Sequence, residues 1–300
     1  GISRQGMTMR RGARYLDAMG GVDVGGVLLS NPFMTASGTS GNDVELSGYM
    51  PLRRLGAVVV KSLFHESWPG NPSPRVHVAA SGMMNAVGLQ GPGVVSWIHE
   101  SLPKLESEGA VVVASIWGTT IEDYALAAEL LRDAPAEVVA VEVNVSCPNL
   151  HDRNRMFAHA PETTAEAIQA ASVCGRPMWA KLSPNVSDLA SIAKAAHSAG
   201  ADAVTLVNTV LGMAIDTETR TYRLGGGGGG LSGPAIHPVA VRAVHDVYAA
   251  YPEIPIIGVG GISSLEDARE KIAAGASLVQ IYTSLIYQGP ALVRKIARGL

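Results

Sequence analysis

Short apolar runs alternate with segments of helical periodicity along most of the chain. The runs are rich in Val, Ile and Ala, which is typical of parallel strands buried on both faces. Alternation of this kind predicts a parallel sheet whose strands are joined by crossover helices. Eight strands are expected at 32–36, 57–61, 111–115, 139–144, 178–182, 203–207, 255–259 and 278–282.

The helical segments between them carry recognisable boundaries. Segment 120–132 has apolar positions at helical spacing, segment 187–198 begins at Ser187 as its expected N-cap, and segment 264–274 begins at Ser264. Residues 22–29 are interpreted as a short hairpin that closes a barrel floor. The chain is therefore predicted to be an α/β protein, a (β/α)8 TIM barrel, with a doubly wound open sheet as the alternative.

The predicted barrel is a single domain over residues 1–300, preceded by an N-terminal segment at 1–21. Whether residues 1–6 are native or a cloning remnant stays open. Six consecutive glycines at 225–230 follow the sixth strand, and we interpret them as a mobile loop over the barrel mouth, too flexible to be a buried element.

Composition and charge exclude several classes of function. The formal net charge is −3 without a basic stripe, so no nucleic-acid partner is expected. No apolar run approaches the roughly 18–20 residues of a membrane span, and the first 21 residues lack the apolar core of a signal peptide. We therefore expect a cytoplasmic protein with no membrane association. The two cysteines cannot supply the four ligands of a ferredoxin-type iron–sulfur cluster, and no metal site is predicted.

Polar residues close most of the predicted strands. In a barrel enzyme the chemistry lies at the carboxyl ends of the strands, so a ring of such residues marks a candidate site. For any one of them, a solvent-facing strand terminus is an equally good interpretation, but that interpretation is hard to sustain for the whole ring. The residues are Ser37, Lys61, Ser115, Asn144, Lys181, Asn208 and Thr283.

A glycine turn after the seventh strand has the features of a phosphate cradle. Gly260 and Gly261 are followed by a helix that opens at Ser264, so backbone N–H groups and the helix dipole can face an anion. A tight turn without a ligand is the alternative. The turn lacks the later glycine and acidic residue of a Rossmann fingerprint, so no dinucleotide site is predicted.

Cys147 lies just past the fourth strand in the motif Asn-Val-Ser-Cys-Pro-Asn at 144–149. A free thiol has a pKa of about 8.5, so suitable surroundings could make it a proton acceptor. A buried, inert cysteine is the alternative. The two flanking amides, Asn144 and Asn149, and the strand-end position favour an active-site loop.

These motifs resemble those of class 1 dihydroorotate dehydrogenases. The motif at 144–149 is similar to the family's signature, and Asn-Ala-Val-Gly-Leu-Gln at 85–90 is similar to its substrate loop. Two further segments, 180–186 and 229–236, resemble the form called class 1B. The resemblance runs in the right order from about residue 29 to the end of the sequence.

The resemblance implies an oxidoreductase of pyrimidine biosynthesis that converts dihydroorotate to orotate at an FMN-binding barrel. Cys147 would take the proton from C5 of the substrate, and the flavin would take the hydride from C6. The implied FMN contacts are Ser37, Lys61, Ser62, Ser115, Asn144, Lys181, Val207, Gly233, Gly260, Gly261, Tyr282 and Thr283. The implied substrate contacts are Lys61, Asn85, Ala86, Val87, Gly88, Leu89, Asn144, Asn149, Asn208 and Thr209.

Two positions depart from the family's pattern. Tyr282 precedes Thr283 where class 1 usually has glycine, which resembles class 2, but Cys147 stands where class 2 has serine. Ser115 stands where an asparagine is common, which weakens the case for that contact.

The resemblance also implies partners: a homodimer, and a second subunit carrying FAD and a 2Fe-2S cluster that passes electrons to NAD. A class 1A enzyme using fumarate is the alternative. A dihydropyrimidine dehydrogenase-type flavin barrel, a non-redox sugar-phosphate isomerase and a catalytically silent binding barrel are the other rivals. Lys61 and the asparagines favour an anionic substrate over a neutral pyrimidine.

Overall fold

The computed structural model describes residues 21–147, 156–297 and 299–300. Within them, eight parallel strands close into a barrel in the order β10-β13-β14-β3-β4-β7-β8-β9. The sequence-predicted strands are confirmed, each to within two residues at either end. The barrel strands are β3 (Phe33–Thr35), β4 (Ala57–Val59), β7 (Val112–Ile116), β8 (Val138–Asn144), β9 (Met178–Leu182), β10 (Ala203–Leu206), β13 (Ile256–Val259) and β14 (Leu278–Ile281).

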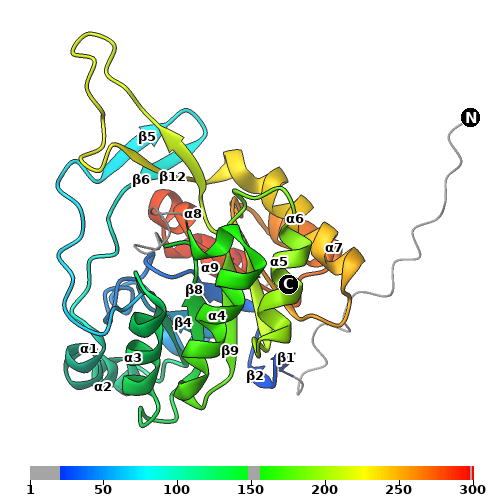
Figure 1. The fold of residues 1–300 in the computed structure, drawn as a ribbon. Helices are drawn as coiled ribbons and strands as arrows, with labels where there is room; N and C mark the ends of the chain where they lie inside the picture. The colour runs from blue at the N-terminus through cyan, green and yellow to red at the C-terminus, as the bar shows by residue number, and fades with distance from the viewer. Residues whose placement is uncertain (1–20, 148–155, 298) are drawn as a thin grey trace, which may run out of the picture.

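Helices cover the outside of the barrel (Figure 1). They are α1 (Val94–Glu100), α2 (Leu102–Ser107), α3 (Ile121–Leu131), α4 (Pro161–Ala171), α5 (Leu189–Ser198), α6 (His237–Ala250), α7 (Leu265–Ala274), α8 (Thr283–Gln288) and α9 (Pro290–Ala297), with short 3-10 turns η1 (Leu52–Arg54), η2 (Phe157–His159), η3 (Ser172–Cys174) and η4 (Pro234–Ile236).

Two helix starts follow the local sequence closely, and a third corrects it. Thr120 and Asp123 form a capping box at α3, and the Ser264 side chain accepts from the Asp267 N–H at α7. The expected cap at Ser187 was wrong, because α5 begins two residues later at Leu189. The Asp188 carboxylate accepts from the Ser191 N–H at 3.1 Å, and its charge also favours the helix N-terminus.

A hairpin closes the amino-terminal end of the barrel, as the sequence predicts. Strands β1 (Val22–Val24) and β2 (Val27–Leu29) pair antiparallel. Their side chains Val24, Val27 and Leu29 are buried against the inner residues of the barrel, including Trp179. This apolar floor leaves the carboxyl end of the barrel as the end that can carry a site.

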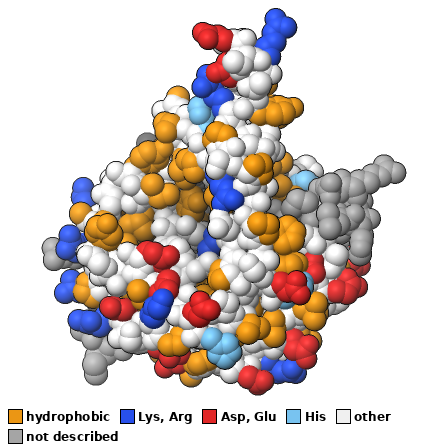
Figure 2. Space-filling model, turned by 90° about the vertical axis from the view of Figure 1, so that its left-hand side faces the viewer, with side chains coloured by type: hydrophobic (Ala, Val, Ile, Leu, Met, Phe, Trp, Pro, Cys, Tyr) orange, Lys and Arg blue, Asp and Glu red, His pale blue; other side chains and the backbone are white. Residues whose placement is uncertain are grey.

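An antiparallel sheet lies at that opposite end (Figure 1). Its order is β11-β12-β6-β5, from β5 (Val76–Ala79), β6 (Gly82–Asn85), β11 (Val210–Met213) and β12 (Gly228–Ser232). The connection between β11 and β12 projects from the molecule, and Figure 2 shows acidic and basic side chains at its tip.

The glycine run at 225–230 is not a loop throughout, which corrects the expectation from its composition. Gly228–Ser232 forms strand β12, where Gly230 pairs with Asn85. A Cβ on Gly230 would lie 2.1 Å from Thr209 Oγ1, and one on Gly229 would lie 2.7 Å from the Asn85 carbonyl oxygen. The glycines therefore allow close backbone packing over the barrel mouth rather than mobility.

In the part of the chain that the structure describes, no helix combines the length and the apolar character needed to cross a membrane. Most of the N-terminal segment expected at 1–21 lies outside the described residues, and the single-domain division stays a prediction.

Candidate active site

A pocket opens at the carboxyl ends of the barrel strands, between them and the antiparallel sheet. It has an empty volume of about 1130 Å³, counting its open mouth, which is ample for a ligand of nucleotide size. The pocket is lined by Ala36, Ser37, Lys61, Ser62, Asn85, Ala86, Val87, Gly88, Leu89, Asn144, Ser146, Lys181, Val207, Asn208, Thr209, Ser232, Gly233, Pro234, Ile236, Val259, Gly260, Gly261, Ile262, Gln280, Tyr282, Thr283 and Ser284.

The sequence-predicted site residues line this pocket with three exceptions. Ser115 and Cys147 are fully buried and lie behind the lining, and Asn149 lies outside the described residues. Sequence reasoning missed several lining side chains, among them Ser232 and Gln280. Ser232 stands in the segment 229–236 that carried the family resemblance, whereas Gln280 is one polar residue inside an apolar strand.

Hydroxyl groups form a chain at the ends of three neighbouring strands. The Ser62 hydroxyl lies 2.8 Å from Ser115 Oγ and 3.3 Å from Ser37 Oγ, and it accepts from Asn144 Nδ2 at 3.4 Å. Ser115 therefore acts on the pocket through Ser62 rather than by lining it. This arrangement orients Asn144 and Ser62, which both face the cavity.

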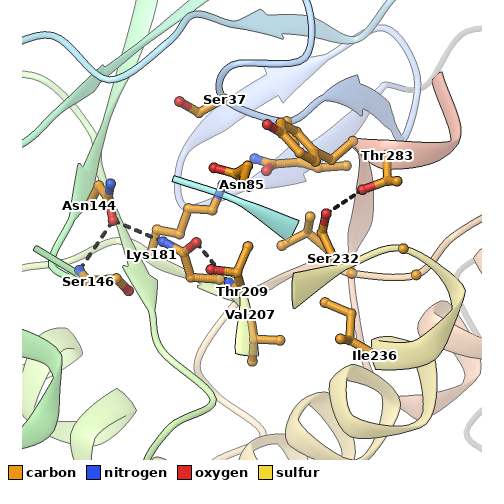
Figure 3. A pocket seen from close by; sticks show the side chains of 18 of the residues that line it. Ser37, Asn85, Asn144, Ser146, Lys181, Val207, Thr209, Ser232, Ile236 and Thr283 are labelled. Atoms are coloured by element: carbon orange, nitrogen blue, oxygen red, sulfur yellow. Dashed lines mark hydrogen bonds between the residues drawn. The ribbon is translucent and has the colours of Figure 1, made fainter. Parts of the chain in front are cut away.

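Amide side chains meet at one end of the pocket. Asn208 Nδ2 donates to Asn144 Oδ1 at 3.1 Å, and the same oxygen accepts from the Ser146 N–H at 3.2 Å. Figure 3 shows Asn144, Ser146 and Lys181 gathered at this end, whereas Ser232 and Thr283 lie at the other. The amide end offers both donors and acceptors, which a ligand with a mixed polar edge requires.

Two lysines face the pocket, and they differ in their partners. Lys181 Nζ lies 3.5 Å from Glu142 Oε1, and the other carboxylate oxygen accepts from Thr205 Oγ1 at 3.1 Å and Gln280 Nε2 at 2.9 Å. Within the described residues Lys61 has no such carboxylate. Burial, and next the charge of Lys181, lower the pKa of Lys61 to about 8. An anion bound beside Lys61 would oppose both effects and favour its charged form.

Cys147 lies one layer behind the pocket wall. It is packed with Phe64 and Trp117 and contacted by Leu89, which lines the cavity. Its thiol lies 3.5 Å from the Asn144 carbonyl oxygen, to which the Tyr124 hydroxyl also donates at 2.9 Å. Burial raises the pKa of Cys147 to about 12, against the opposing effects of Lys61 and the Tyr124 hydroxyl. In this arrangement the thiol is protonated at neutral pH.

A cradle of three glycines forms the other end of the pocket. Gly233, Gly260 and Gly261 have φ angles of 99°, 113° and 73°, which favour glycine. A Cβ on Gly261 would lie 2.5 Å from the backbone of His237, so the two turns could not approach one another with a side chain there. Helix α7 starts nearby with Ser264 as its cap. Exposed N–H groups at such a turn suit a phosphate.

Comparison with known proteins matches this architecture to one family. A family model described as dihydroorotate dehydrogenase covers residues 19–300. A relative from Alkaliphilus metalliredigens, named dihydroorotate dehydrogenase B (NAD(+)), catalytic subunit, is 47% identical over 264 residues, 88% of this chain and 86% of its own length. Proteins of the same name from Desulforudis audaxviator and Listeria innocua are 46% and 44% identical, covering 90% and 87% of this chain and 88% and 86% of their own.

These matches confirm the resemblance predicted from the motifs, including its class 1B character. The identity extends over nearly all of the barrel, so it is not confined to the glycine turns that unrelated barrels share. The chain belongs to the dihydroorotate dehydrogenase family, flavin-dependent oxidoreductases of pyrimidine biosynthesis that act on a CH–CH bond.

Proposed function

We propose that this protein oxidises dihydroorotate to orotate with FMN bound in the pocket at the barrel mouth. The observation that carries the proposal is the polarity of one continuous cavity. A glycine cradle suited to a phosphate lies at one end, and Lys181 with a cluster of amides lies at the other (Figure 3). Lys61 also lines the pocket and lies close enough to Lys181 for their charges to interact. A flavin mononucleotide has a phosphate at one end and a redox-active ring at the other, which matches this division.

The residues present fit FMN. The cradle residues Gly233, Gly260 and Gly261, with Thr283 beside them, would hold the phosphate through their backbone N–H groups. Gly261 has to be glycine, because any side chain there would clash with His237. Lys181 would lie at the ring, where its charge favours added electron density. When bound, the flavin supplies the two-electron acceptor that the protein side chains lack.

The substrate would lie at the amide end. Lys61 supplies a cation for a carboxylate, and a carboxylate bound there would favour the charged form that burial and the charge of Lys181 disfavour. Asn85, Asn144 and Asn208 would bind the polar edge of the pyrimidine ring, and Thr209 borders it. These roles are supported by position and chemistry.

Cys147 is proposed to act as a thiolate that takes the proton from C5 of dihydroorotate at its Sγ atom, while a hydride leaves C6 and C5=C6 becomes a double bond. The thiol must therefore release its own proton to solvent before this step. The thiol lies behind Leu89, so proton transfer requires Cys147 to turn toward the cavity. Its neighbour Ser146 already lines the pocket, so the required displacement is local. Exposure would also lower the thiol pKa, because burial is what raises it.

Reoxidation is proposed to use a second subunit that carries FAD and a 2Fe-2S cluster and passes electrons to NAD. The relatives are named catalytic subunits of an NAD(+) enzyme, and this sequence holds only two cysteines. Turnover by the isolated chain with fumarate would contradict this part of the proposal. The homodimer and the cytoplasmic location stay predictions.

The test is a visible absorption spectrum of the purified protein before and after anaerobic addition of dihydroorotate. A flavin spectrum that bleaches supports both cofactor and substrate. A flavin that stays oxidised, yet bleaches with another dihydropyrimidine, replaces the substrate. Absence of flavin after reconstitution with FMN refutes the proposal.

A further inference from the structure

Lys271 is a fully buried lysine directly behind the glycine cradle. It lies on helix α7 and has 0% of its surface exposed. Its ammonium group lies 3.0 Å from the Gly260 carbonyl oxygen, 3.4 Å from the His237 carbonyl oxygen and 3.3 Å from His237 Nδ1. The three N–H groups of the Lys271 ammonium therefore have three acceptor atoms within reach. Burying a cation is costly unless it is satisfied in this way, so the position calls for a functional explanation.

The charged groups around Lys271 come from the two helices packed there. On α6, His237 Nε2 lies 2.8 Å from Glu270 and 3.9 Å from Asp267, both on α7. A neutral His237 that donates from Nε2 to Glu270 leaves Nδ1 free to accept from Lys271. Within the described residues Lys271 has no carboxylate within 4 Å. Burial lowers its pKa to about 7, while Glu270 and Asp267 oppose this shift.

The contacts of Lys271 orient the cradle. In a trans peptide the C=O and the following N–H point in opposite directions. Because the Gly260 carbonyl points back to Lys271, the Gly261 N–H points away from Lys271, and Gly261 lines the pocket. No hydrogen-bond acceptor for this N–H is found among the described residues. The same ammonium group binds the His237 carbonyl, so it joins the two turns that form the cradle.

Lys271 is also the cation placed to act on this end of the cavity. Two lysines line the pocket: Lys61 follows strand β4, and Lys181 lies on strand β9. Among the residues that the structure describes, no arginine lines it. Lys181 lies at the amide end (Figure 3). A charge behind the cradle acts through a low-dielectric wall and is poorly screened by solvent.

We propose that Lys271 is a positioning residue of the phosphate cradle, which aims the Gly261 amide at the phosphate and supplies the charge that selects a phosphorylated flavin over an unphosphorylated one. The proposal rests on the proposed binding of FMN in this pocket. It assigns to Lys271 a ligand preference that a merely structural lysine would not produce.

The test is a competition between FMN and riboflavin, which differ by the phosphate. Flavin-loaded full-length protein is dialysed to equilibrium against mixtures of the two, and the bound ratio is measured by chromatography. For Lys271→Met we expect the bound FMN-to-riboflavin ratio to fall at least about tenfold relative to wild type. The matched control Lys194→Met removes a half-exposed lysine on α5, outside the pocket lining, and should leave the ratio unchanged.

An unchanged ratio in Lys271→Met, including an equal weakening of both flavins, would overturn the proposal. If that variant does not fold, the wild-type ratio at pH 7 and pH 9.5 decides. Loss of the Lys271 charge should lower the ratio, whereas titration of Lys61 at the ring end affects both flavins alike. A ratio that does not fall with pH overturns the inference. If wild type binds neither flavin, the proposed function itself has failed.

Discussion

The buried pair formed by Lys181 and Glu142 permits a prediction that does not depend on any ligand. Their side chains are 8% and 0% exposed, and the charged atoms are 3.5 Å apart inside the barrel. Glu142→Gln keeps the size of the side chain and removes its charge, so no cavity forms. What remains is a buried ammonium group without its counter-ion.

The magnitude follows from that uncompensated charge. Removing one partner of a buried ion pair costs about 3–5 kcal/mol of unfolding free energy. Thr205 and Gln280 also lose a charged acceptor, so we expect the upper half of that range. A domain of this kind has a total stability of roughly 5–15 kcal/mol, so the variant should unfold at clearly lower urea concentration.

The assay is equilibrium urea unfolding of the flavin-free protein followed by tryptophan fluorescence, because bound ligand adds stability and Lys181 is a proposed flavin contact. Trp179 is fully buried next to Ala180 and Lys181 on β9 and reports on the barrel interior. The control is Glu142→Gln combined with Lys181→Met, which removes both charges and should recover much of the loss. An ordinary surface ion pair contributes up to about 1 kcal/mol. The reasoning is refuted if the unfolding free energy of Glu142→Gln lies within about 1 kcal/mol of the wild-type value. It is also refuted if the double variant is no more stable than Glu142→Gln.

Three further predictions concern the site. Cys147→Ala should lower kcat by about 10²–10⁴-fold while the protein stays yellow, because only the proton acceptor is lost; near-normal turnover, or loss of flavin, would count against the assigned role. The wild-type KM for dihydroorotate should rise above pH 8, where Lys61 loses its charge, as measured by steady-state kinetics from pH 6 to 9.5; a constant KM would separate Lys61 from the carboxylate. Gly230→Ala should raise KM for dihydroorotate with flavin content unchanged, because its Cβ would displace Thr209. Gly228→Ala is the control: the nearest atom to its Cβ would be 3.4 Å away, so its kinetics should stay close to wild type. Equal kinetics of the two variants would contradict this prediction.

Much of the fold could be predicted because its determinants are local. Each barrel strand is a short, mainly apolar run, and the side chains of Thr120 and Ser264 cap helices through contacts three residues away. The glycine turn at Gly260 and the strand-end lysines also show in the sequence, because barrel topology brings all carboxyl ends to one face. Ser187 shows the limit of such signals. Its neighbour Asp188 can also cap a helix, and it is Asp188 that caps α5, one residue after the predicted cap.

The remaining features depend on contacts between segments far apart in the chain. Glu142, Lys181, Thr205 and Gln280 are isolated polar residues in four mainly apolar strands. Only closure of the barrel brings these side chains close together. The glycines at 225–230 have the composition of a flexible loop, yet their pairing with β6, more than 140 residues earlier, places part of them in a sheet.

Residue types and their spacing were enough to predict the family, the barrel and many of the polar groups at its mouth. Packing among distant segments places some of those predicted groups in the cavity wall and others behind it, as it does Cys147 and Ser115. It also buries Lys271, which no sequence signal had marked. The physical reason is that burial, and with it the pKa of a side chain, is set by packing among distant segments, whereas residue type and spacing are set by the chain alone.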